Sequence, residues 1–478
     1  MNILYVASEV APFAASGGLG DVMGALPKTL KRLAGKETGV SVVMPLYSSI
    51  SETYRQKMRL LDEFEFMYGW RHAYCGVLTL RMDGVDYYFI DNEQYFMRHS
   101  LYGQYDDGER FAYFCRAVVE MMLRMDTAFD VLHANDWQSA LAVIYLKTRF
   151  AECEKFRGIK TVFTIHNIEY QGKYDEYILG NIFDLDAKYL SILEYDHCIN
   201  LMKGAIVCCD LLTTVSPTYA CEIKEPYFAY GLSDIIREND YKLKGIINGI
   251  DTKVFSPTDD NDIAFPFMLS ERMEGKRQNK LALQREIGLA EDPDVPLIAM
   301  VTRLTHGKGI DLVLRIFDEM MTSDVQFVLL GTGDSNYEKI FSDLCARYPD
   351  RAKALIRFDR ALSKRIYAAA SLFLMPSKSE PCGLAQMIAC SYGAIPVVRS
   401  VGGLADTIIP YGQENANGFR FNNFNAHELL FTVKDALEVY RDGEEWDQLV
   451  RRAMKTDFSW NTSAKEYLAT YQKLMSRK

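Results

Sequence analysis

The chain opens with the aliphatic run Ile3-Leu4-Tyr5-Val6-Ala7, which ends at Ser8-Glu9, and the glycine-rich segment Ser16-Gly17-Gly18-Leu19-Gly20-Asp21 follows soon after. A short apolar run that ends in polar residues is typical of a buried β-strand. A glycine-rich turn between a strand and helical sequence presents backbone N–H groups and a helix N-terminus to an anion. Residues 3–21 therefore predict a strand, a loop and a helix, the opening unit of a parallel α/β sheet.

A second glycine-rich loop, Val401-Gly402-Gly403-Leu404-Ala405-Asp406, resembles the first and lies late in the chain. It also follows a strand-like run and precedes helical sequence. Two such loops facing one cleft would suit a sugar diphosphate. A Gly-Gly pair alone is a weak signal, because it also forms an ordinary turn between a strand and a helix.

Short aliphatic or β-branched runs recur along the chain, with segments of helical periodicity between them. This alternation predicts parallel βαβ units, and hence an α/β fold with two doubly wound, Rossmann-like sheets. Ligands bind such sheets beyond the carboxyl ends of the strands, so the residues just after each run are the candidates for chemistry. The runs are Ile3–Ala7, Ser41–Met44, Val131–Ala134, Thr161–Ile165, Leu211–Val215, Pro296–Val301, Gln326–Leu330, Ala354–Arg357, Leu372–Met375 and Ile395–Val398.

The length of 478 residues exceeds one ordinary core and fits two large domains. The apolar segment that ends in the turn signal Asn248-Gly249 is followed by polar sequence, which places a boundary near residue 246. We expect an N-terminal domain at 1–245 and a C-terminal domain at 246–456. The helical pattern at 457–478 is expected to cross back to the first domain.

Composition excludes several classes of function. The net charge is −10, which gives no basic field for nucleic acid. No stretch is apolar for long enough to span a bilayer, and the N-terminus lacks the basic segment of a signal peptide. Ten cysteines without a Cys-x-x-Cys pair indicate neither a zinc site nor a disulfide framework. The sequence predicts a cytoplasmic protein with reduced thiols, whose partner is a small molecule or a neutral polymer.

Two cations follow the strand that ends at Val301. Arg303 and Lys308 stand in the loop after it. Fixed positive charges at this place can offset the charge that grows on a diphosphate as a glycosidic bond breaks. A pair of solvated surface cations is the alternative interpretation.

The segment after Leu374 is more specific. Glu380 stands after a strand end and is followed by Pro381 and by Cys382-Gly383-Leu384 at a helix start. The carboxylate can bind hydroxyls while the amides face phosphate or sugar. The alternative is that Glu380 caps the next helix.

Two further strand ends carry polar residues in the first half. His166 follows Thr161–Ile165, where its imidazole could bind a sugar hydroxyl, although a lone histidine there is more often structural. Asp136-Trp137 supplies an acid and a flat apolar ring, a pair that carbohydrates use for hydrogen bonding and stacking. A capped helix with a buried indole is the alternative.

Along almost its whole length the chain resembles the bacterial glycogen synthase and plant starch synthase family. The matching motifs occur in the same order, which makes chance agreement negligible. They are Ser8–Pro12, Gly17–Leu19, His133–Trp137, Thr164–Asn167, Tyr170–Gly172, Thr214–Tyr219, Ile247–Asp251, the Arg303/Lys308 loop, Glu380–Leu384, Gly402–Asp406, Asp457–Trp460 and Ser463-Ala464. The resemblance implies a GT-B fold, in which two Rossmann-like domains face a deep cleft that closes for catalysis.

The resemblance also implies roles for individual residues. Arg303 and Lys308 would hold the donor diphosphate, Glu380 would hold glucose hydroxyls, and His166 would contact the sugar beside the anomeric carbon. The glucosyl and acceptor subsite would include Tyr95, Asp136, Trp137 and Asn248. Asn248 would also contact the donor, and Phe358 would stack on the base of the donor. The remaining donor-binding residues would be Gly17, Gly18, Asp21, Cys382, Gly383, Leu384, Gly402, Gly403 and Leu404.

One position departs from the family. The family's first loop reads Lys-Thr/Val-Gly-Gly-Leu, whereas this chain has Ala15-Ser16 before its glycines. The lysine, which would add a donor or acceptor contact, is therefore missing.

The predicted reaction is transfer of glucose from ADP-glucose to the non-reducing end of an α-1,4-glucan, with retention of configuration. Two alternatives stay open: a related retaining transferase that uses UDP-glucose or another acceptor, and a non-catalytic glucan-binding homologue. Neither a metal nor another cofactor is expected. Asp292-Pro293-Asp294 spells a metal-binding string, but it precedes its strand and is interpreted as a linker.

Overall fold

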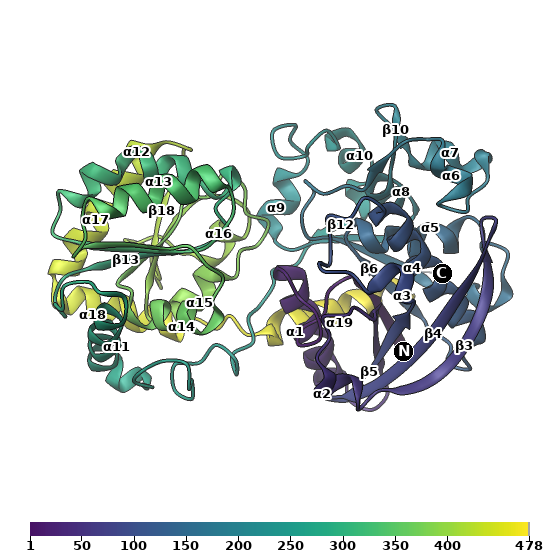
Figure 1. The fold of residues 1–478 in the computed structure, drawn as a ribbon, viewed down its shortest axis with the longest axis horizontal. Coiled ribbons are helices and arrows are strands. Elements are labelled where there is room, and N and C mark those ends of the chain that lie inside the picture. Colours follow the sequence, from purple (N-terminus) through teal and green to yellow (C-terminus); the bar gives the residue numbers. More distant parts are fainter. Residues whose placement is uncertain (477–478) are drawn as a thin grey trace. The chain divides into compact units, whose positions relative to one another are not determined.

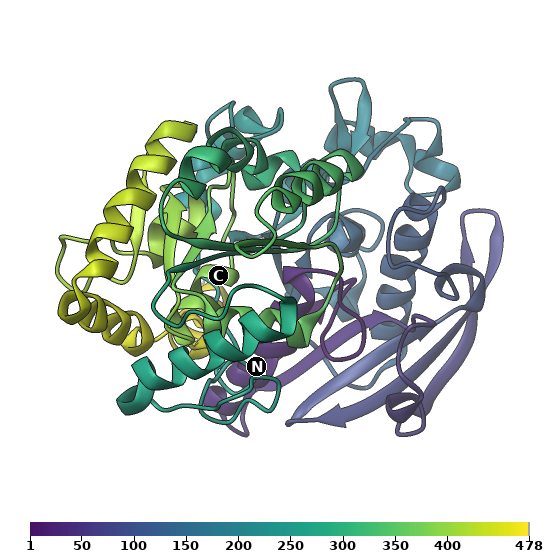
Figure 2. The ribbon, with the colours of Figure 1, turned by 60° about the vertical axis from the view of Figure 1, so that its left-hand side comes forward.

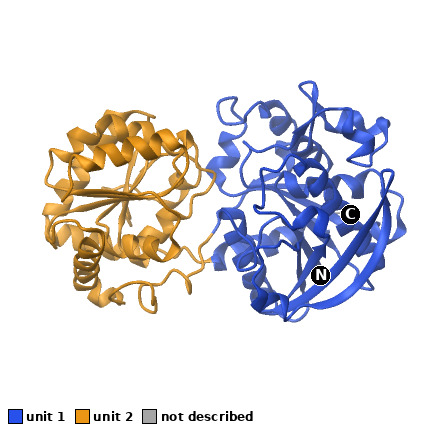
Figure 3. Cartoon of the chain, in the orientation of Figure 1, with its two compact units in different colours: residues 1–248, 460–478 blue, residues 249–459 orange. Residues whose placement is uncertain are grey.

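The computed structural model describes residues 1–476, which form two compact units. Unit 1 combines residues 1–248 with the C-terminal helix from Trp460, and unit 2 is formed by Gly249–Ser459 (Figure 3). The chain passes from unit 1 to unit 2 after Asn248 and returns to unit 1 after Ser459, and each of these positions lies three residues after the predicted boundary. Ile246 remains in unit 1 because it is buried and its N–H donates to Thr214 O at 2.9 Å. Phe458 remains in unit 2, where its carbonyl accepts from Ile250 N at 2.8 Å.

The large sheet of unit 1 has the strand order β12-β11-β7-β6-β1-β2-β5-β4-β3. The strands from β12 to β5 run parallel, and β4 and β3 are antiparallel. In β1, residues Ile3–Val6 are fully buried, because helices cover both faces of the parallel region. The bounds are β1 (Asn2–Val6), β2 (Gly39–Pro45), β3 (Arg59–Tyr68), β4 (Arg71–Met82), β5 (Val85–Asp91), β6 (Val131–Asn135), β7 (Lys160–Ile165), β11 (Leu211–Thr214) and β12 (Leu243–Gly245).

The hairpin of β3 and β4 was not predicted from the sequence. Its strands pair from Tyr68↔Arg71 outward across the two-residue turn Gly69-Trp70, and it extends along the edge of unit 1 (Figures 1 and 2). Gly69 has φ +57°, a conformation that glycine adopts without strain. In the second half of β3 the exposed Glu63, Glu65 and Met67 alternate with the buried Phe64, Phe66 and Tyr68, so the hairpin lacks the continuous buried apolar runs that identified the central strands.

Helices cover the sheet of unit 1, and a small antiparallel sheet, β8-β10-β9, lies beside them. The helices are α1 (Gly18–Ala34), α2 (Glu52–Arg55), α3 (Glu93–Phe96), α4 (Asp107–Arg124), α5 (Trp137–Lys147), α6 (Ile178–Asn181), α7 (Leu190–Leu193), α8 (Leu201–Cys208), α9 (Pro217–Glu222), α10 (Ser233–Glu238) and α19 (Trp460–Ser476), and the small strands are β8 (Lys173–Tyr174), β9 (Glu194–Tyr195) and β10 (Cys198–Asn200).

Helix α19 completes the core of unit 1, as the sequence predicted for its C-terminal helix; residues 477–478 of that prediction lie outside the described residues. It packs beside α1, although the two helices stand at opposite ends of the chain (Figure 1). The hydroxyl of Tyr471 hydrogen-bonds with Tyr5 OH at 2.8 Å and with His133 Nδ1 at 2.7 Å. The other ring nitrogen of His133 hydrogen-bonds with Thr164 Oγ1. This fully buried polar network joins α19 to β1, β6 and β7.

Unit 2 contains a parallel sheet of order β15-β14-β13-β16-β17-β18. Figure 1 shows this sheet edge-on, with α12 and α13 on one face and α11, α14, α15 and α18 on the other. The strands are β13 (Leu297–Val301), β14 (Gln326–Leu330), β15 (Ala352–Leu355), β16 (Leu372–Met375), β17 (Ile395–Arg399) and β18 (Phe419–Phe421), and the helices are α11 (Arg272–Ile287), α12 (Ile310–Met321), α13 (Ser335–Ala346), α14 (Arg360–Ala369), α15 (Ala385–Ser391), α16 (Gly402–Thr407), α17 (Ala426–Arg441) and α18 (Gly443–Lys455).

Each sheet contains one point at which the order of its parallel strands reverses. In unit 1 the chain forms β1 and β2, then the edge strands β3 and β4, then β5 between β2 and β4, and it returns to β6 on the other side of β1. In unit 2 it builds from β13 to β15 and returns to β16. The connections diverge at such a point and leave a crevice beyond the carboxyl ends of the two strands, where ligands bind. The pairs β1/β6 and β13/β16 therefore each mark a candidate binding position in their own unit.

Among residues 1–476, no helix combines the length and the apolar composition that a membrane span requires.

Tyr471→Phe tests the contribution of α19 to unit 1. The change leaves Tyr5 OH and His133 Nδ1 without their shared partner in a dry interior, which costs about 1–3 kcal/mol. We expect a lower Tm in thermal unfolding, with Gln472→Ala, at an exposed position of the same helix, as the control. An unchanged Tm for Tyr471→Phe would mean that the network does not stabilise the unit.

Candidate active site

Asp136 stands directly after β6 and has a strained backbone, with φ +57° and ψ 176°. This region of backbone space is almost confined to glycine and costs a non-glycine residue about 1–3 kcal/mol. Its carboxylate accepts from His166 N at 2.7 Å and Asn167 N at 3.4 Å. Burial raises the pKa of Asp136 to about 7, helped by the nearby carboxylate of Glu9 and opposed by the two N–H groups. Strain at a strand end of the switch point marks Asp136 as a candidate functional group.

His166, directly after β7, is held as one neutral tautomer. Asn135 donates through Nδ2 to the carbonyls of Val6 and His133, both at 3.2 Å, so its Oδ1 must accept. The His166 Nε2–H therefore donates to Asn135 Oδ1 at 2.9 Å, which leaves Nδ1 as an acceptor. Burial lowers the pKa of His166 to about 3. The ring is consequently uncharged at neutral pH and suited to binding a hydroxyl.

Glu9 is a buried acid that the sequence analysis assigned no role. Its carboxylate accepts from Ser16 N at 2.5 Å, Ser16 Oγ at 2.9 Å and Gly17 N at 3.1 Å. It therefore fixes the glycine-rich loop to the end of β1. Its position just after β1, inside the motif Ser8–Pro12, was the available signal.

The glycine-rich loop itself is exposed and has space against its backbone. A Cβ placed on Gly17 or Gly18 would meet no atom within 4 Å, and Gly17 is extended with φ −164°. These glycines are therefore not required by their backbone angles; they leave room for a ligand. Ala15 packs on Gly20, where an added Cβ would lie 2.4 Å from that of Ala15. Asp21 lies in the first turn of α1, where a carboxylate favours the helix dipole.

Trp137, the first residue of α5, is a half-buried ring held from several sides. Phe111 meets it edge-on with ring centroids 5.4 Å apart, and Tyr174 lies 6.0 Å away. Gly172 lies against the indole so closely that a Cβ there would come within 2.7 Å of the ring. Trp137 also lines a pocket of about 590 Å³ together with Tyr170 and Tyr230.

Two of the predicted subsite residues of unit 1 are buried. Tyr95 stacks on Tyr113 at 4.6 Å, and its hydroxyl donates to Glu109 Oε1 at 2.8 Å. Asn248 is 5% exposed and its Oδ1 is one of the buried polar atoms that lack a hydrogen-bond partner. Such an orphaned acceptor costs free energy unless a ligand satisfies it.

In unit 2 the strand ends of the switch point hold an ion pair. Lys308 Nζ donates to both carboxylate oxygens of Glu380, at 2.9 and 2.7 Å, and Ser377 Oγ donates to the same carboxylate at 3.0 Å. Glu380 is 6% exposed, whereas Arg303, in the same loop as Lys308, is exposed. The structure thus brings Lys308 to Glu380 and leaves the Arg303 guanidinium in solvent.

The segment Cys382-Gly383-Leu384 and the second glycine-rich loop pack together beside Glu380. A Cβ on Gly402 would lie 1.9 Å from Glu380 O, and one on Gly403 would lie 2.2 Å from Cys382 O. Gly383 and Gly402 also have positive φ, +72° and +42°. These glycines are required by close approach and conformation, and they let the loop before the buried Leu404 pack on the backbone of Glu380 and Cys382.

Arg399, at the end of β17, is a second residue without a predicted role. Its guanidinium donates to Lys378 O at 2.7 Å and so supports the loop that carries Glu380. Phe358 follows β15 and is 89% exposed, and Asp359 next to it caps α14 through Leu362 N at 2.9 Å. The predicted run Ala354–Arg357 starts two residues late, because Ala352 already pairs with Phe327.

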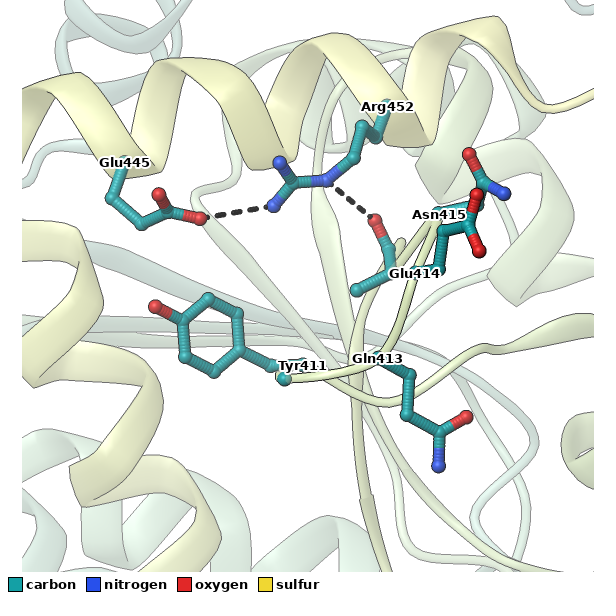
Figure 4. Close-up of a pocket in the computed structure, with 8 residues that line it drawn as sticks. Tyr411, Gln413, Glu414, Asn415, Glu445 and Arg452 are labelled. Carbon is teal, nitrogen blue, oxygen red and sulfur yellow. Dashed lines mark hydrogen bonds and ion pairs between the residues drawn. The ribbon is translucent and has the colours of Figure 1, made fainter.

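A separate pocket of about 360 Å³ in unit 2 carries none of these residues (Figure 4). Arg452 lies in it, donating to Ala416 O at 3.1 Å and to Glu445 at 3.0 Å. The loop 410–418 that forms its wall enters the amino end of β18, opposite the strand ends that carry Glu380. Across the described chain, no group of three or more His, Cys, Asp or Glu side chains is arranged for a metal ion.

Both halves of the chain match known protein families. Residues 2–238 match the starch synthase catalytic domain, and residues 285–455 match the glycosyl transferases of group 1. In structure, the catalytic domain of starch synthase IV from Arabidopsis thaliana bound to ADP and acarbose has a TM-score of 0.91 and 32% identity, covering 99% of both chains. Sucrose-phosphate synthase from Thermosynechococcus elongatus, at TM-score 0.62 and 16% identity, shares the fold. The protein is a glycosyltransferase with the GT-B fold.

Full-length relatives identify the family. Glycogen synthase of Geobacillus thermodenitrificans is 48% identical over 481 residues, covering 100% of this chain and 98% of that protein. Glycogen synthase of Bacillus cereus (strain ATCC 10987 / NRS 248) is 47% identical over 479 residues, covering 99% and 100%. The chain belongs to the glycogen synthase and starch synthase family, which confirms the predicted resemblance.

Asp136→Asn tests the raised pKa. An acid whose pKa is higher in the folded state stabilises that state at low pH, and the stability is lost as pH rises through the folded pKa, here about 7. The variant has no such loss. Between pH 5 and pH 8 its unfolding free energy, from urea denaturation, should gain about 2–3 kcal/mol on the wild type. The exposed Asp126→Asn serves as control, and parallel pH profiles for Asp136→Asn and wild type would contradict the prediction.

Proposed function

We propose that the protein transfers glucose from ADP-glucose to the non-reducing end of an α-1,4-glucan, with retention of configuration. The observation that carries the proposal is the Lys308–Glu380 pair, at 2.7 Å, at the switch point of unit 2. Each unit also has one glycine-rich loop, which supports a sugar diphosphate as the substrate class. The loop of unit 1 leaves open space at Gly17 and Gly18, and the loop of unit 2 packs tightly at Gly402 and Gly403. The chain's membership of the glycogen and starch synthase family supports the reaction.

Unit 2 binds the donor in this proposal. Arg303 and Lys308 offset the charge that develops on the diphosphate, Glu380 accepts hydrogen bonds from the glucose hydroxyls, and Phe358 stacks on the base. The backbone N–H groups of the two glycine loops contact the phosphates and sugar. These cations supply the positive charge, so the proposed reaction requires no metal and no other cofactor.

Unit 1 binds the glucosyl group and the acceptor. The neutral His166 accepts a hydroxyl through Nδ1, Asp136 binds a second hydroxyl, and Asn248 Oδ1 gains the partner that it lacks. The bond between the anomeric carbon and the diphosphate oxygen breaks, and a bond to the acceptor 4-oxygen forms on the same face. The acceptor proton passes to the departing diphosphate, so ADP leaves as the protonated product.

A cytoplasmic location is part of the proposal. All ten cysteines, which lie within the described residues, are free thiols, as expected for a protein in a reducing compartment.

The deciding experiment measures nucleoside diphosphate release from ADP-glucose and UDP-glucose, with and without glycogen or maltooligosaccharide. We expect ADP release that depends on glucan. Glu380→Gln should reduce kcat/KM by about 10²–10³-fold, because it removes the charge that orients Lys308 and the sugar. Glu444→Gln, on the exposed first turn of α18, is the matched control. Turnover by Glu380→Gln within a few-fold of wild type would refute the assigned role.

Ala15→Lys restores the positive charge that the family carries before its glycines. Ala15 is exposed and lies beside Gly17 and Gly18, so the new side chain can reach an anion on the loop. We expect KM for ADP-glucose or for the glucan to fall by roughly two- to five-fold, the value of one partly exposed charge pair. Ala15→Met supplies similar length without charge. Equal effects of the two changes would exclude an electrostatic role for position 15.

A further inference from the structure

The two loops at the switch point of unit 2 share one buried side chain, Gln386. It is the second residue of α15 and is fully buried. Its Nε2 donates to Cys382 O at 3.1 Å and to Gly383 O at 2.9 Å, in the segment that follows Glu380. It also donates to Thr407 Oγ1 at 3.0 Å. Thr407 is the last residue of α16, the helix that starts in the second glycine-rich loop. One amide therefore contacts both segments.

Thr407 extends this contact to the second glycine-rich loop. Its hydroxyl donates its single proton to Gly403 O at 2.6 Å, so it must accept from Gln386. Thr407 is buried as well. The N–H of Gly403 lies 3.2 Å from both Glu380 O and Pro381 O, to which it donates. Gly403 is therefore held at its carbonyl by Thr407 and at its N–H by the segment that carries Glu380.

The Gln386 amide can adopt only one of its two orientations. The three atoms around Nε2 are two carbonyl oxygens and a hydroxyl oxygen whose proton is used on Gly403, so all three accept. Turning the amide over would place Oε1 against these oxygens. Within residues 1–476, the buried Oε1 has no hydrogen-bond partner, which costs free energy. Local departures of this kind are typical of places where function sets the geometry.

Gly383 packs directly on this amide. A Cβ added to Gly383 would lie 2.6 Å from Gln386 Oε1, and the residue has φ +72°. The chain can make this turn over the amide because glycine has no side chain and adopts a positive φ without strain. Gln386 and Gly383 together fix the direction of the backbone between Cys382 and Leu384. The proposed function assigns the N–H groups of this backbone to the donor.

We propose that Gln386 and Thr407 are positioning residues, a clamp that holds the two donor-binding loops of unit 2 at a fixed spacing. Both side chains are buried and act through the backbone of the two loops, without touching substrate. The inference rests on the proposed function and deepens it, because it names the side chains that preorganise the loops for a nucleoside diphosphate. Without the clamp the loops can move, so the nucleotide binds more weakly, while binding of glucan to unit 1 is unchanged.

The test measures the Kd of ADP by isothermal titration calorimetry, together with KM for ADP-glucose and for maltohexaose. Gln386→Met keeps the length of the side chain and removes its amide. We expect the Kd of ADP and KM for ADP-glucose to rise about ten-fold, the effect of losing one or two buried hydrogen bonds, while KM for maltohexaose stays within about two-fold. An unchanged Kd of ADP in Gln386→Met would overturn the proposal.

Thr407 tests the second half of the clamp. Thr407→Ser retains the hydroxyl and should bind ADP within about two-fold of wild type, whereas Thr407→Val, which keeps the shape and loses the hydroxyl, should bind it about five-fold more weakly. In the double variant Gln386→Met with Thr407→Val, the loss of affinity should be much smaller than the product of the two single effects, because the two side chains form one contact. Effects that multiply would show that the residues act independently and would overturn the clamp.

Gln326→Met is the matched control. Gln326 is 2% exposed, and its Nε2 donates to Ala290 O at 2.7 Å. It is the first residue of β14, whereas Glu380 follows the last residue of β16, so the two lie at opposite ends of the parallel strands of unit 2. Both Gln→Met changes should lower Tm, but only Gln386→Met should weaken ADP binding. An equal loss of ADP affinity in the two variants would show that Gln386 contributes stability alone, and would overturn the proposal.

Binding of ADP without a glucan separates this proposal from the proposed function. A wild type that binds ADP but releases none from ADP-glucose refutes the proposed reaction, and weaker ADP binding by Gln386→Met still supports the clamp. A wild type that turns over ADP-glucose, with the same Kd of ADP in Gln386→Met, refutes the clamp alone. A wild type that binds neither ADP nor UDP refutes both.

Discussion

A parallel sheet must bury both of its faces, and this constraint arranges the whole molecule. Each connection between parallel strands has to cross a face of the sheet, so helices cover both sides and polar groups are confined to the strand ends. Where the strand order reverses, at β1/β6 and β13/β16, the connections leave in opposite directions and the strand ends lie open. Asp136, Glu9 and the Lys308–Glu380 pair all stand at these two places.

The two units differ in the charge of the side chains at their switch points. Burial keeps His166 uncharged, with a pKa of about 3, and raises that of Asp136 to about 7, so unit 1 offers hydrogen bonds with little net charge. Unit 2 instead presents Arg303 and Lys308, with one acid, Glu380, bound to the lysine. A substrate that is neutral at one end and anionic at the other complements this division.

The central strands could be predicted because they are short, apolar on both faces and followed by polar residues. Each predicted run overlaps an observed strand, although β15 begins earlier than expected. The β3–β4 hairpin could not be found in this way, since one of its faces is in solvent and its pattern is mixed. The turn at Gly69-Trp70 was a signal only in combination with strands that had not been recognised.

The site was predicted unevenly for the same physical reason. Strand ends point to Asp136, His166, Arg303 and Glu380, because topology places them there. Glu9 and Arg399 each hydrogen-bond to the backbone of a loop from another part of the chain. A single acid or arginine in the sequence does not reveal which loop it will bind. Gln171 hydrogen-bonds with Asn200 and with the carbonyl of Tyr230, which are far away in the chain, so its place in the wall of the pocket beside Trp137 becomes visible only in three dimensions.

The network around Tyr471 also bears on how the chain is made. Unit 2 is one continuous stretch, whereas unit 1 needs both the first 248 residues and α19. Synthesis proceeds from the N-terminus and domains generally fold as units, so every residue of unit 2 has been translated before α19 exists. Until then, Tyr5 and His133 lack their shared hydroxyl partner in the core. Of these two units, the one whose synthesis starts earlier is therefore the one that is completed later.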